Sequence, residues 1–205
     1  MKCFIFDIDG TLIDSAPMYL PTLEQVLRDY GYTPTDEQIR TAFGMTGREG
    51  LKLCGVPADK VEEVMHNWEQ EAYRHFDRVL IYDGIIDTLH ALREAGHKIG
   101  IVTSRNRSQY DNGFVPLGLS DLFDAAVCAD EVAVPKPAPD SIFALLEQVG
   151  CAAEDTVFLG DSPYDIQCAH AAGVKSALAL WGSHNPELQA DFRLNHPREL
   201  LQLAD

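Results

Sequence analysis

The chain opens with an apolar strand that runs directly into two carboxylates and a glycine, Phe4-Ile5-Phe6-Asp7-Ile8-Asp9-Gly10-Thr11. A strand alternates the direction of its side chains, but Gly10 permits a sharp bend just after Asp7. Both carboxylates can therefore turn toward one ligand. Open parallel sheets bind ligands at the carboxyl ends of their strands, and Asp7 stands at such an end. The run predicts a phosphate or metal site, although a strand capped by an acidic turn has the same pattern.

Strand-like apolar runs recur along the chain, and helical patterns separate most of them. The five predicted strands are Cys3–Phe6, Ile99–Val102, Ala125–Cys128, Thr156–Leu159 and Ser176–Leu180. This alternation is typical of an α/β fold with a parallel, Rossmann-like sheet. The tail from Gly182 predicts a loop and a short closing helix at Pro197–Leu203. With 205 residues, the chain can bury a sizeable core and still hold a smaller insert.

A long helical segment interrupts the sheet early. About ninety residues separate the first predicted strand from the second, far more than a crossover connection needs. Ser15–Phe76 has helical patterns almost throughout, with one apolar stripe ending at Tyr30 before Gly31 and another running from Val61 to Phe76. Packing between helices explains both stripes without any cofactor. The segment is therefore interpreted as a small helical bundle.

Turn residues mark both ends of this insert. They are Asp14-Ser15-Ala16-Pro17 on one side and Tyr82-Asp83-Gly84 on the other. We therefore predict two domains, a core formed by residues 1–14 and 83–205 and a helical cap formed by residues 15–82. Two hinges beside one active site are typical of a lid.

Charge and cysteine usage exclude several classes of function. Thirty-two acidic and sixteen basic side chains give a formal net charge of -16, which repels nucleic acid and anionic membranes. Five scattered cysteines without a C-x-x-C pair fit a reduced protein better than a disulfide or zinc framework. Met1-Lys2 leads straight into the first strand, and no apolar run reaches membrane-spanning length. We expect a soluble cytoplasmic protein without nucleic-acid or membrane partners.

Three later segments place polar residues where the first site could use them. Thr103 and Ser104 end a predicted strand, where hydroxyl and backbone N–H groups suit a phosphate oxygen, although such a pair is often a helix cap. Lys136 stands between prolines ahead of a helix and is either a counter-charge or an ordinary surface lysine. Asp161 follows another strand, and Asp165 begins a helix, where an acid is ordinarily a cap.

In a parallel sheet these strand ends fall on the same edge. Asp7, Asp9 and Asp161, with Asp165 nearby, would then crowd one spot. Such repulsion is tolerated mainly where a hard cation is bound. The combination therefore favours a divalent metal at this edge.

The ordered set of these motifs resembles the haloacid dehalogenase (HAD) superfamily of phosphohydrolases. The set comprises Asp7-x-Asp9-Gly10-Thr11, Thr103, Lys136 and Gly160-Asp161-x-x-x-Asp165. The resemblance covers essentially the whole chain, and the helical insert looks like the C1-type cap of that superfamily. Asp14-Ser15-Ala16-Pro17 is similar to the phosphoglycolate phosphatase-like branch in particular.

This resemblance implies a Mg²⁺-dependent phosphatase that acts on a small phosphorylated metabolite. Asp7 would attack phosphorus and form an aspartyl-phosphate, with Asp9 as general acid and base. Mg²⁺ would be held by the Asp7 side chain, the Asp9 backbone carbonyl and Asp161. Asp165 would be a further ligand or a close neighbour of the ion.

The resemblance also implies how the phosphoryl group is bound. Thr103 would donate to a phosphoryl oxygen, beside Gly10 and Ser104, while Lys136 would neutralise negative charge. The cap loop that ends at Arg48 is expected to choose the substrate. Arg48 itself is either a ligand for an anionic leaving group or a solvated surface arginine.

Other branches of the superfamily fit these residues less well. Dehalogenases and phosphonatases of the superfamily lack the second acid, and Asp9 is present. The β-phosphoglucomutase branch keeps both acids, so a sugar phosphate mutase stays an alternative. That branch carries a histidine where this chain has Tyr19, which weighs against it. A catalytically silent binding module is a second alternative. Asp7 and Lys136 are intact, which weighs against it. Phosphoglycolate, a sugar phosphate, a nucleotide monophosphate and pyrophosphate all stay open as substrates, and a monomer or weak homodimer is expected.

Overall fold

The computed structural model describes residues 1–204, and its contacts divide the chain into two compact units. Unit 1 comprises Met1–Ile13 together with the chain from Ile81 onward, and unit 2 comprises Asp14–Leu80. The predicted boundaries between core and cap were 14/15 and 82/83. Two short strands, β2 (Ile13–Asp14) and β3 (Leu80–Ile81), form a separate two-stranded sheet where the chain passes between the units.

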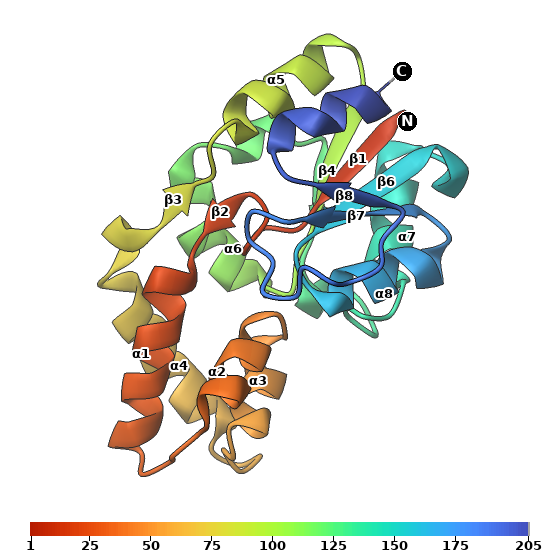
Figure 1. The fold of residues 1–205 in the computed structure, drawn as a ribbon. Coiled ribbons are helices and arrows are strands. Elements are labelled where there is room, and N and C mark those ends of the chain that lie inside the picture. Colours follow the sequence, from red (N-terminus) through yellow and green to blue (C-terminus); the bar gives the residue numbers. More distant parts are fainter. Residues whose placement is uncertain (205) are drawn as a thin grey trace. The chain divides into compact units, whose positions relative to one another are not determined.

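Unit 1 is built on a six-stranded sheet in the order β5-β4-β1-β6-β7-β8 (Figure 1). Its strands are β1 (Cys3–Phe6), β4 (Lys98–Val102), β5 (Ala125–Val127), β6 (Thr156–Gly160), β7 (Lys175–Ala179) and β8 (Phe192–Leu194). All five neighbouring pairs are parallel. The predicted α/β fold with a parallel sheet is therefore confirmed.

Helices cover this sheet and bury its apolar strands. They are α5 (Ile85–Glu94), α7 (Asp140–Val149) and α8 (Pro163–Ala172), while α6 (Arg107–Gly113) packs against the 3-10 helices Val115–Leu117 and Ala129–Glu131. Helix α7 packs on β4 and β5, α8 on β6 and β7, and α5 on β4 (Figure 1). Strands β1 and β6 are buried along their whole length, which is why they are almost continuously apolar instead of alternating. The core cluster includes Ile5, Val102 and Phe158 beside Leu145.

Unit 2 is a helical bundle, as its apolar stripes predict. Its helices are α1 (Ala16–Asp29), α2 (Asp36–Phe43), α3 (Gly47–Leu53) and α4 (Val61–Tyr73). A capping box at Thr35 starts α2, and Gly31 takes a φ of +83° just beyond α1. The apolar faces of α1 and α4 pack against each other. The ring of Trp68 lies edge-on to that of Tyr19, with 5.6 Å between the ring centroids.

The C-terminal tail differs from the prediction in one element. Residues 192–194 form β8, which was expected to be loop, and the closing helix at Pro197–Leu203 is a 3-10 helix. The carboxylate of Asp191 anchors β8 to β7, because it accepts hydrogen bonds from the backbone N–H of Ser176 and from Lys175. The remaining 3-10 helices are Phe76–Arg78, Val115–Leu117, Ser120–Leu122, Ala129–Glu131 and Ala153–Asp155.

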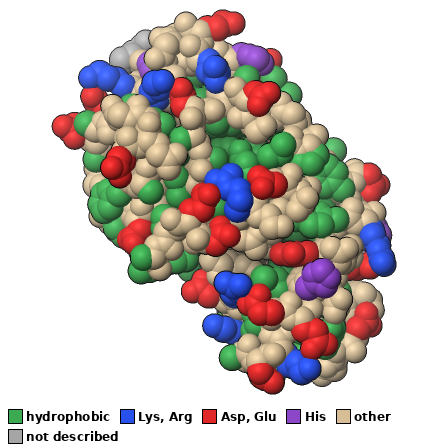
Figure 2. Space-filling model, turned by 180° about the vertical axis from the view of Figure 1, so that it is seen from behind, with side chains coloured by type: hydrophobic (Ala, Val, Ile, Leu, Met, Phe, Trp, Pro, Cys, Tyr) green, Lys and Arg blue, Asp and Glu red, His purple; other side chains and the backbone are tan. Residues whose placement is uncertain are grey.

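Charged side chains of both signs share the surface. Figure 2 shows acidic groups spread over one face of the molecule with basic groups between them, as expected for twice as many acids as bases. Within residues 1–204, none of the helices has the length and apolarity that crossing a bilayer requires.

Candidate active site

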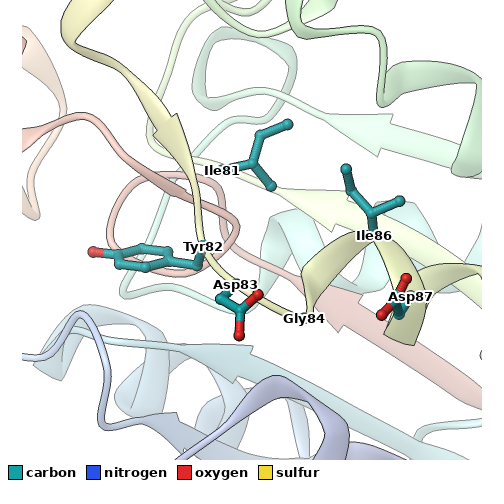
Figure 3. A pocket seen from close by; sticks show the side chains of 6 residues that line it. All are labelled: Ile81, Tyr82, Asp83, Gly84, Ile86 and Asp87. Carbon is teal, nitrogen blue, oxygen red and sulfur yellow. The ribbon is translucent and has the colours of Figure 1, made fainter.

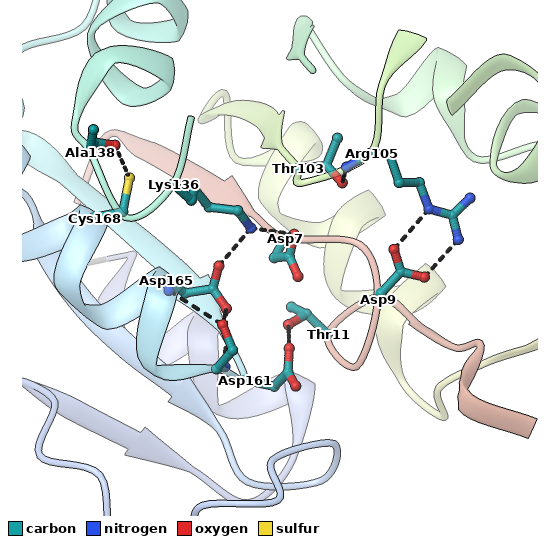
Figure 4. Close-up of polar contacts among 11 residues, drawn as sticks. Asp7, Asp9, Thr11, Thr103, Arg105, Lys136, Ala138, Asp161, Asp165 and Cys168 are labelled. Atoms are coloured by element: carbon teal, nitrogen blue, oxygen red, sulfur yellow. Dashed lines mark hydrogen bonds and ion pairs between the residues drawn. The ribbon is translucent and has the colours of Figure 1, made fainter. Parts of the chain in front are cut away.

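The carboxyl ends of three central strands place the predicted site residues at one edge of the sheet (Figure 4). Phe6 of β1 pairs with Ile101 of β4 on one side and with Leu159 of β6 on the other. The residues that follow these strands therefore emerge together. Asp7 is fixed there by its own backbone, since its N–H donates to the carbonyl of Leu159 at 2.9 Å.

Asp7, Asp161 and Asp165 form a compact cluster of carboxylates. One oxygen from each lies within 4.8 Å of the others, and all three residues are buried. Burial raises the pKa of Asp7 to about 7, against the opposing charge of Lys136. Burial, reinforced by Asp165 and Asp7, also raises the pKa of Asp161 well above its usual range. Burial and the neighbouring carboxylates therefore both disfavour the ionised form of these two groups.

Lys136 supplies the positive charge within this cluster. Its ammonium donates to Oδ1 of Asp7 and to Oδ1 of Asp165, each at 2.7 Å, and its side chain is only 3% exposed. It also lies 5.6 Å from the ring centroid of Phe158. Burial opposes the lysine's charge, but Asp165 and Asp7 outweigh it and raise its pKa. One ammonium does not balance the charge of three carboxylates, so a further cation could bind here.

Two glycines make the cluster possible. Gly10 has a φ of +79°, and a Cβ at this position would overlap the carboxylate of Asp161. Thr11, next in the turn, donates from Oγ1 to Oδ1 of Asp161 at 3.3 Å. In the same way a Cβ on Gly160 would overlap the Asp165 side chain. The predicted turn at Gly10 thus leaves space for the carboxylate of Asp161, which follows strand β6.

Asp165 is both a helix cap and a member of the cluster. It belongs to the capping box that begins α8, in which its Oδ2 accepts from the backbone N–H and the hydroxyl of Ser162 at 3.0 and 2.6 Å. Its Oδ1 meets Lys136. The two interpretations of this acid are therefore compatible, because each oxygen has its own partner.

The carboxylate of Asp9 is not part of the cluster. It accepts a bidentate pair of hydrogen bonds from Arg105, from Nε at 2.8 Å and from Nη2 at 2.6 Å. The expectation that all the carboxylates crowd one spot is wrong for Asp9. A guanidinium matches both carboxylate oxygens at once, whereas a fourth carboxylate in the cluster would add repulsion. In Figure 4 the Asp9 carboxylate points to Arg105, while Asp165 lies on the far side of Asp7 and Asp161 lies next to Thr11.

Sequence reasoning assigned no role to Arg105. The signal was present, since an arginine two residues beyond Thr103 lies close to a strand end that should meet the acidic turns. Thr103 itself is buried, and its Oγ1 accepts from the backbone N–H of Arg105 at 3.2 Å. Ser104, between them, is half-buried. The turn after β4 therefore holds one predicted phosphate ligand and the unpredicted arginine.

The loop after β7 supports both acidic turns and was also missed. Trp181 donates from Nε1 to the backbone carbonyl of Thr11 at 3.0 Å, and Ser183 donates from Oγ to the carbonyl of Asp161 at 2.6 Å. A Cβ on Gly182 would overlap the carbonyl of Gly10. These contacts are made to backbone atoms, which carry no residue-type signal in the sequence.

Arg48, predicted as a ligand for an anionic group, belongs to unit 2. It makes a bidentate ion pair with Glu62, at 2.6 and 3.1 Å, and both side chains are exposed. This is the arrangement of a solvated surface arginine. A role for Arg48 in binding substrate stays a prediction.

A separate pocket lies in unit 1 at the start of α5. Residues 81–84, Ile86 and Asp87 line a volume of about 300 Å³ (Figure 3). None of these lining residues belongs to the carboxylate cluster or was predicted as a site residue. The pocket is therefore distinct from the candidate active site.

The donor set of the cluster suits Mg²⁺. Hard divalent cations prefer carboxylate and carbonyl oxygens, and Asp7, Asp161 and Asp165 each offer one carboxylate oxygen within the 4.8 Å group. A bound cation would also counteract the burial and the neighbouring carboxylates that raise the pKa values of Asp7 and Asp161. The residues present therefore fit the predicted metal.

Comparisons with known sequences agree with the motifs. Residues 4–179 match the family model of haloacid dehalogenase-like hydrolases. The whole chain is 31% identical to N-acetylmuramic acid 6-phosphate phosphatase of Pseudomonas aeruginosa, covering 95% of that protein. It is 33% identical to phosphoglycolate phosphatase of Aquifex aeolicus, covering 97%, and 28% identical to pyrophosphatase PpaX of Bacillus velezensis, covering 96%.

Solved structures share the fold over nearly the whole chain. A protein from Lactobacillus plantarum, considered a phosphoglycolate phosphatase, superposes with a TM-score of 0.90 at 29% identity, covering 98% of both chains. A HAD-superfamily hydrolase of subfamily IA from Geobacter sulfurreducens superposes with a TM-score of 0.78 at 24% identity, covering 99% of both chains. The second likeness concerns the fold alone.

Proposed function

The chain belongs to the haloacid dehalogenase-like hydrolases and is a phosphatase, and we propose that it hydrolyses a small phosphomonoester through an aspartyl-phosphate on Asp7. The family prediction made from the motifs is thereby confirmed. The observation that most supports the mechanism is the buried Asp7 carboxylate, hydrogen-bonded to Lys136 at 2.7 Å and grouped with Asp161 and Asp165.

In the first step Asp7 attacks the phosphorus atom in line with the ester bond. A bond forms between a carboxylate oxygen of Asp7 and phosphorus, and the bond from phosphorus to the ester oxygen breaks. The leaving oxygen needs a proton, and Asp9 is the acid assigned to supply it. Asp9 suits this task because it lies two residues beyond the nucleophile and outside the cluster.

In the second step water hydrolyses the aspartyl-phosphate. Asp9, now ionised, takes a proton from the water as its oxygen attacks phosphorus. The bond between phosphorus and the Asp7 oxygen breaks, which releases inorganic phosphate and restores the carboxylate. One carboxyl group thus acts first as an acid and then as a base.

The phosphoryl oxygens need partners throughout both steps. Thr103 and Ser104 lie at the carboxyl end of β4, beside the strand that carries Asp7, and can donate hydroxyl or backbone hydrogens. Gly10 brings the backbone of the acidic turn close to the same group. Lys136 neutralises part of the negative charge on Asp7 and on the transferring group.

Mg²⁺ would be held by the Asp7 side chain, the Asp9 backbone carbonyl and Asp161, with Asp165 as a further ligand or neighbour. When bound, it neutralises carboxylates and phosphoryl oxygens that would otherwise repel each other.

The substrate proposed for this chain is a small, strongly anionic phosphorylated metabolite of the phosphoglycolate type. The named substrates of three relatives are phosphoglycolate, N-acetylmuramic acid 6-phosphate and pyrophosphate. Each carries a second acidic group beside the phosphate that is removed. This shared chemistry supports a substrate that carries an acidic group in addition to the phosphate that is removed, over the phosphate of an otherwise uncharged sugar.

Release of inorganic phosphate from a panel of small phosphate esters and pyrophosphate tests the proposal. Wild type with Mg²⁺ should turn over at least one compound, and both a chelator and the substitution Asp7→Asn should abolish this turnover. The side-chain amide that this substitution introduces cannot attack phosphorus, while its shape preserves the fold. Isomerisation of glucose 1-phosphate without phosphate release would instead indicate a mutase, and inactivity in both assays would indicate a binding module.

A further inference from the structure

Arg105 is a buried cation that the proposed two-step reaction leaves without a task. Its side chain is 4% exposed, and the guanidinium holds Asp9 through two hydrogen bonds of 2.8 and 2.6 Å. The Asp9 side chain is 18% exposed. The guanidinium therefore lies behind the carboxylate, and the carboxylate is the more accessible member of the pair.

The arginine is itself held firmly. Its Nη1 donates to the backbone carbonyl of Gln109 at 3.3 Å, and its backbone N–H donates to Thr103 at 3.2 Å. Helix α6 starts immediately afterwards with a capping box between Asn106 and Gln109. The guanidinium thus lies between a strand end and a helix start, and both fix its position.

We propose that Arg105 is the positioning residue of the acid/base, which fixes the Asp9 carboxylate in the orientation from which it exchanges a proton with the reacting oxygen. This inference rests on the proposed function of Asp9. Asp9 lies in the turn directly before Gly10, beyond the regular part of β1, so the strand does not fix its side-chain torsions. The planar fork of an arginine fixes both oxygens at once, whereas the single ammonium of a lysine does not.

The ion pair uses only part of the hydrogen-bonding capacity of the Asp9 carboxylate. A carboxylate has about four lone-pair sites, so an arginine that uses one on each oxygen still leaves a site from which a proton can be received or delivered. Buried ion pairs contribute little to stability on balance, which argues for a functional reason to keep this one.

Kinetics of arginine variants test the proposal on the full chain with Mg²⁺. The variants are Arg105→Met, Arg105→Lys, Asp9→Asn and the combination of Arg105→Met with Asp9→Asn. Arg107→Met is the matched control, because Arg107 lies two residues away and makes a similar multiple pair with Glu131 at 2.7 Å. Thermal melting of each variant reports whether it folds. If Arg105→Met does not fold, Arg105→Lys still tests the proposal.

We expect Arg105→Met to lower kcat about 10- to 100-fold, as misplacement of a reacting group by about 1 Å does, with KM little changed. Arg105→Lys should recover only part of the loss, and Arg107→Met should retain wild-type kcat. In the Asp9→Asn background Arg105→Met should have no further effect, because both act through one carboxylate. A purely structural role for Arg105 would not produce this loss of additivity.

Three results would overturn the inference. They are wild-type kcat in Arg105→Met, a loss that multiplies with that of Asp9→Asn, and a raised KM at constant kcat, which would make Arg105 a substrate ligand instead. Failure of the proposed function is distinguishable, since wild type itself would then release no phosphate.

Discussion

The ammonium of Lys136 lies 2.7 Å from the carboxylate of Asp7, although 129 positions separate the two residues in the sequence. The parallel sheet brings the end of β1 to the loop that carries Lys136, and Asp165 completes the contact from the start of α8. Asp7, the proposed nucleophile, therefore shares its counter-ion with Asp165, which caps a helix. Any change at Lys136 should affect the charge balance of the whole cluster.

Removal of the lysine charge should reduce both activity and stability. Lys136→Met leaves three buried carboxylates without their cation, so we expect kcat to fall about 10²- to 10³-fold. Loss of one partner of a buried pair should also cost about 3–5 kcal/mol of unfolding free energy. Phosphate release and urea unfolding measure the two effects. Lys175→Met is the control, because the pair of Lys175 with Asp191 is on the surface, and near-equal losses in both variants would contradict the assigned role.

Metal binding should stabilise the folded protein through the acidic cluster. A ligand that binds only the native state raises the melting temperature as its concentration increases, so Mg²⁺ should raise it and a chelator should reverse the effect. Asp161→Asn removes one carboxylate of the cluster and should reduce the Mg²⁺-dependent shift. Differential scanning calorimetry over a Mg²⁺ series measures this. If Mg²⁺ raised the melting temperature of Asp161→Asn as much as that of wild type, Asp161 would not be a ligand of the metal.

The glycine of the acidic turn should tolerate no side chain. Gly10→Ala would place a Cβ against the Asp161 carboxylate, in addition to the strain of a φ of +79°. Gly55 also has a positive φ, +90°, but a Cβ on Gly55 would meet no atom within 4 Å. Both substitutions should cost about 1–2 kcal/mol from backbone strain, but only Gly10→Ala should abolish phosphatase activity. Unfolding and activity measurements on the pair separate strain from displacement of Asp161.

The sequence was most informative where regular structure determines position. The strand that ends at Phe6 and the one that ends at Gly160 predict that Asp7 and Asp161 meet, because parallel strands present their carboxyl ends at one edge. The direction of Asp9 could not be predicted in this way, since the alternation of a strand ends at the turn and a distant arginine decides the orientation. Strand β8 was missed for a related reason, because three residues carry too short a pattern and Asp191 attaches them from outside the strand.

Attachment of β8 should weaken in acid because it depends on an ionised carboxylate. Hydrogen bonds from Lys175 and from Ser176 lower the pKa of Asp191 to about 2, from an ordinary value of 3.8. Since the folded state has the lower pKa, ionised Asp191 stabilises the fold above about pH 4, and this contribution is lost as the pH falls toward about 2. Asp191→Asn should therefore melt below wild type at pH 7, and the difference should shrink between pH 4 and pH 2. Melting curves over this range test the sign, with the exposed Glu187→Gln as control, and a difference that stays constant with pH would show that Asp191 acts without its charge.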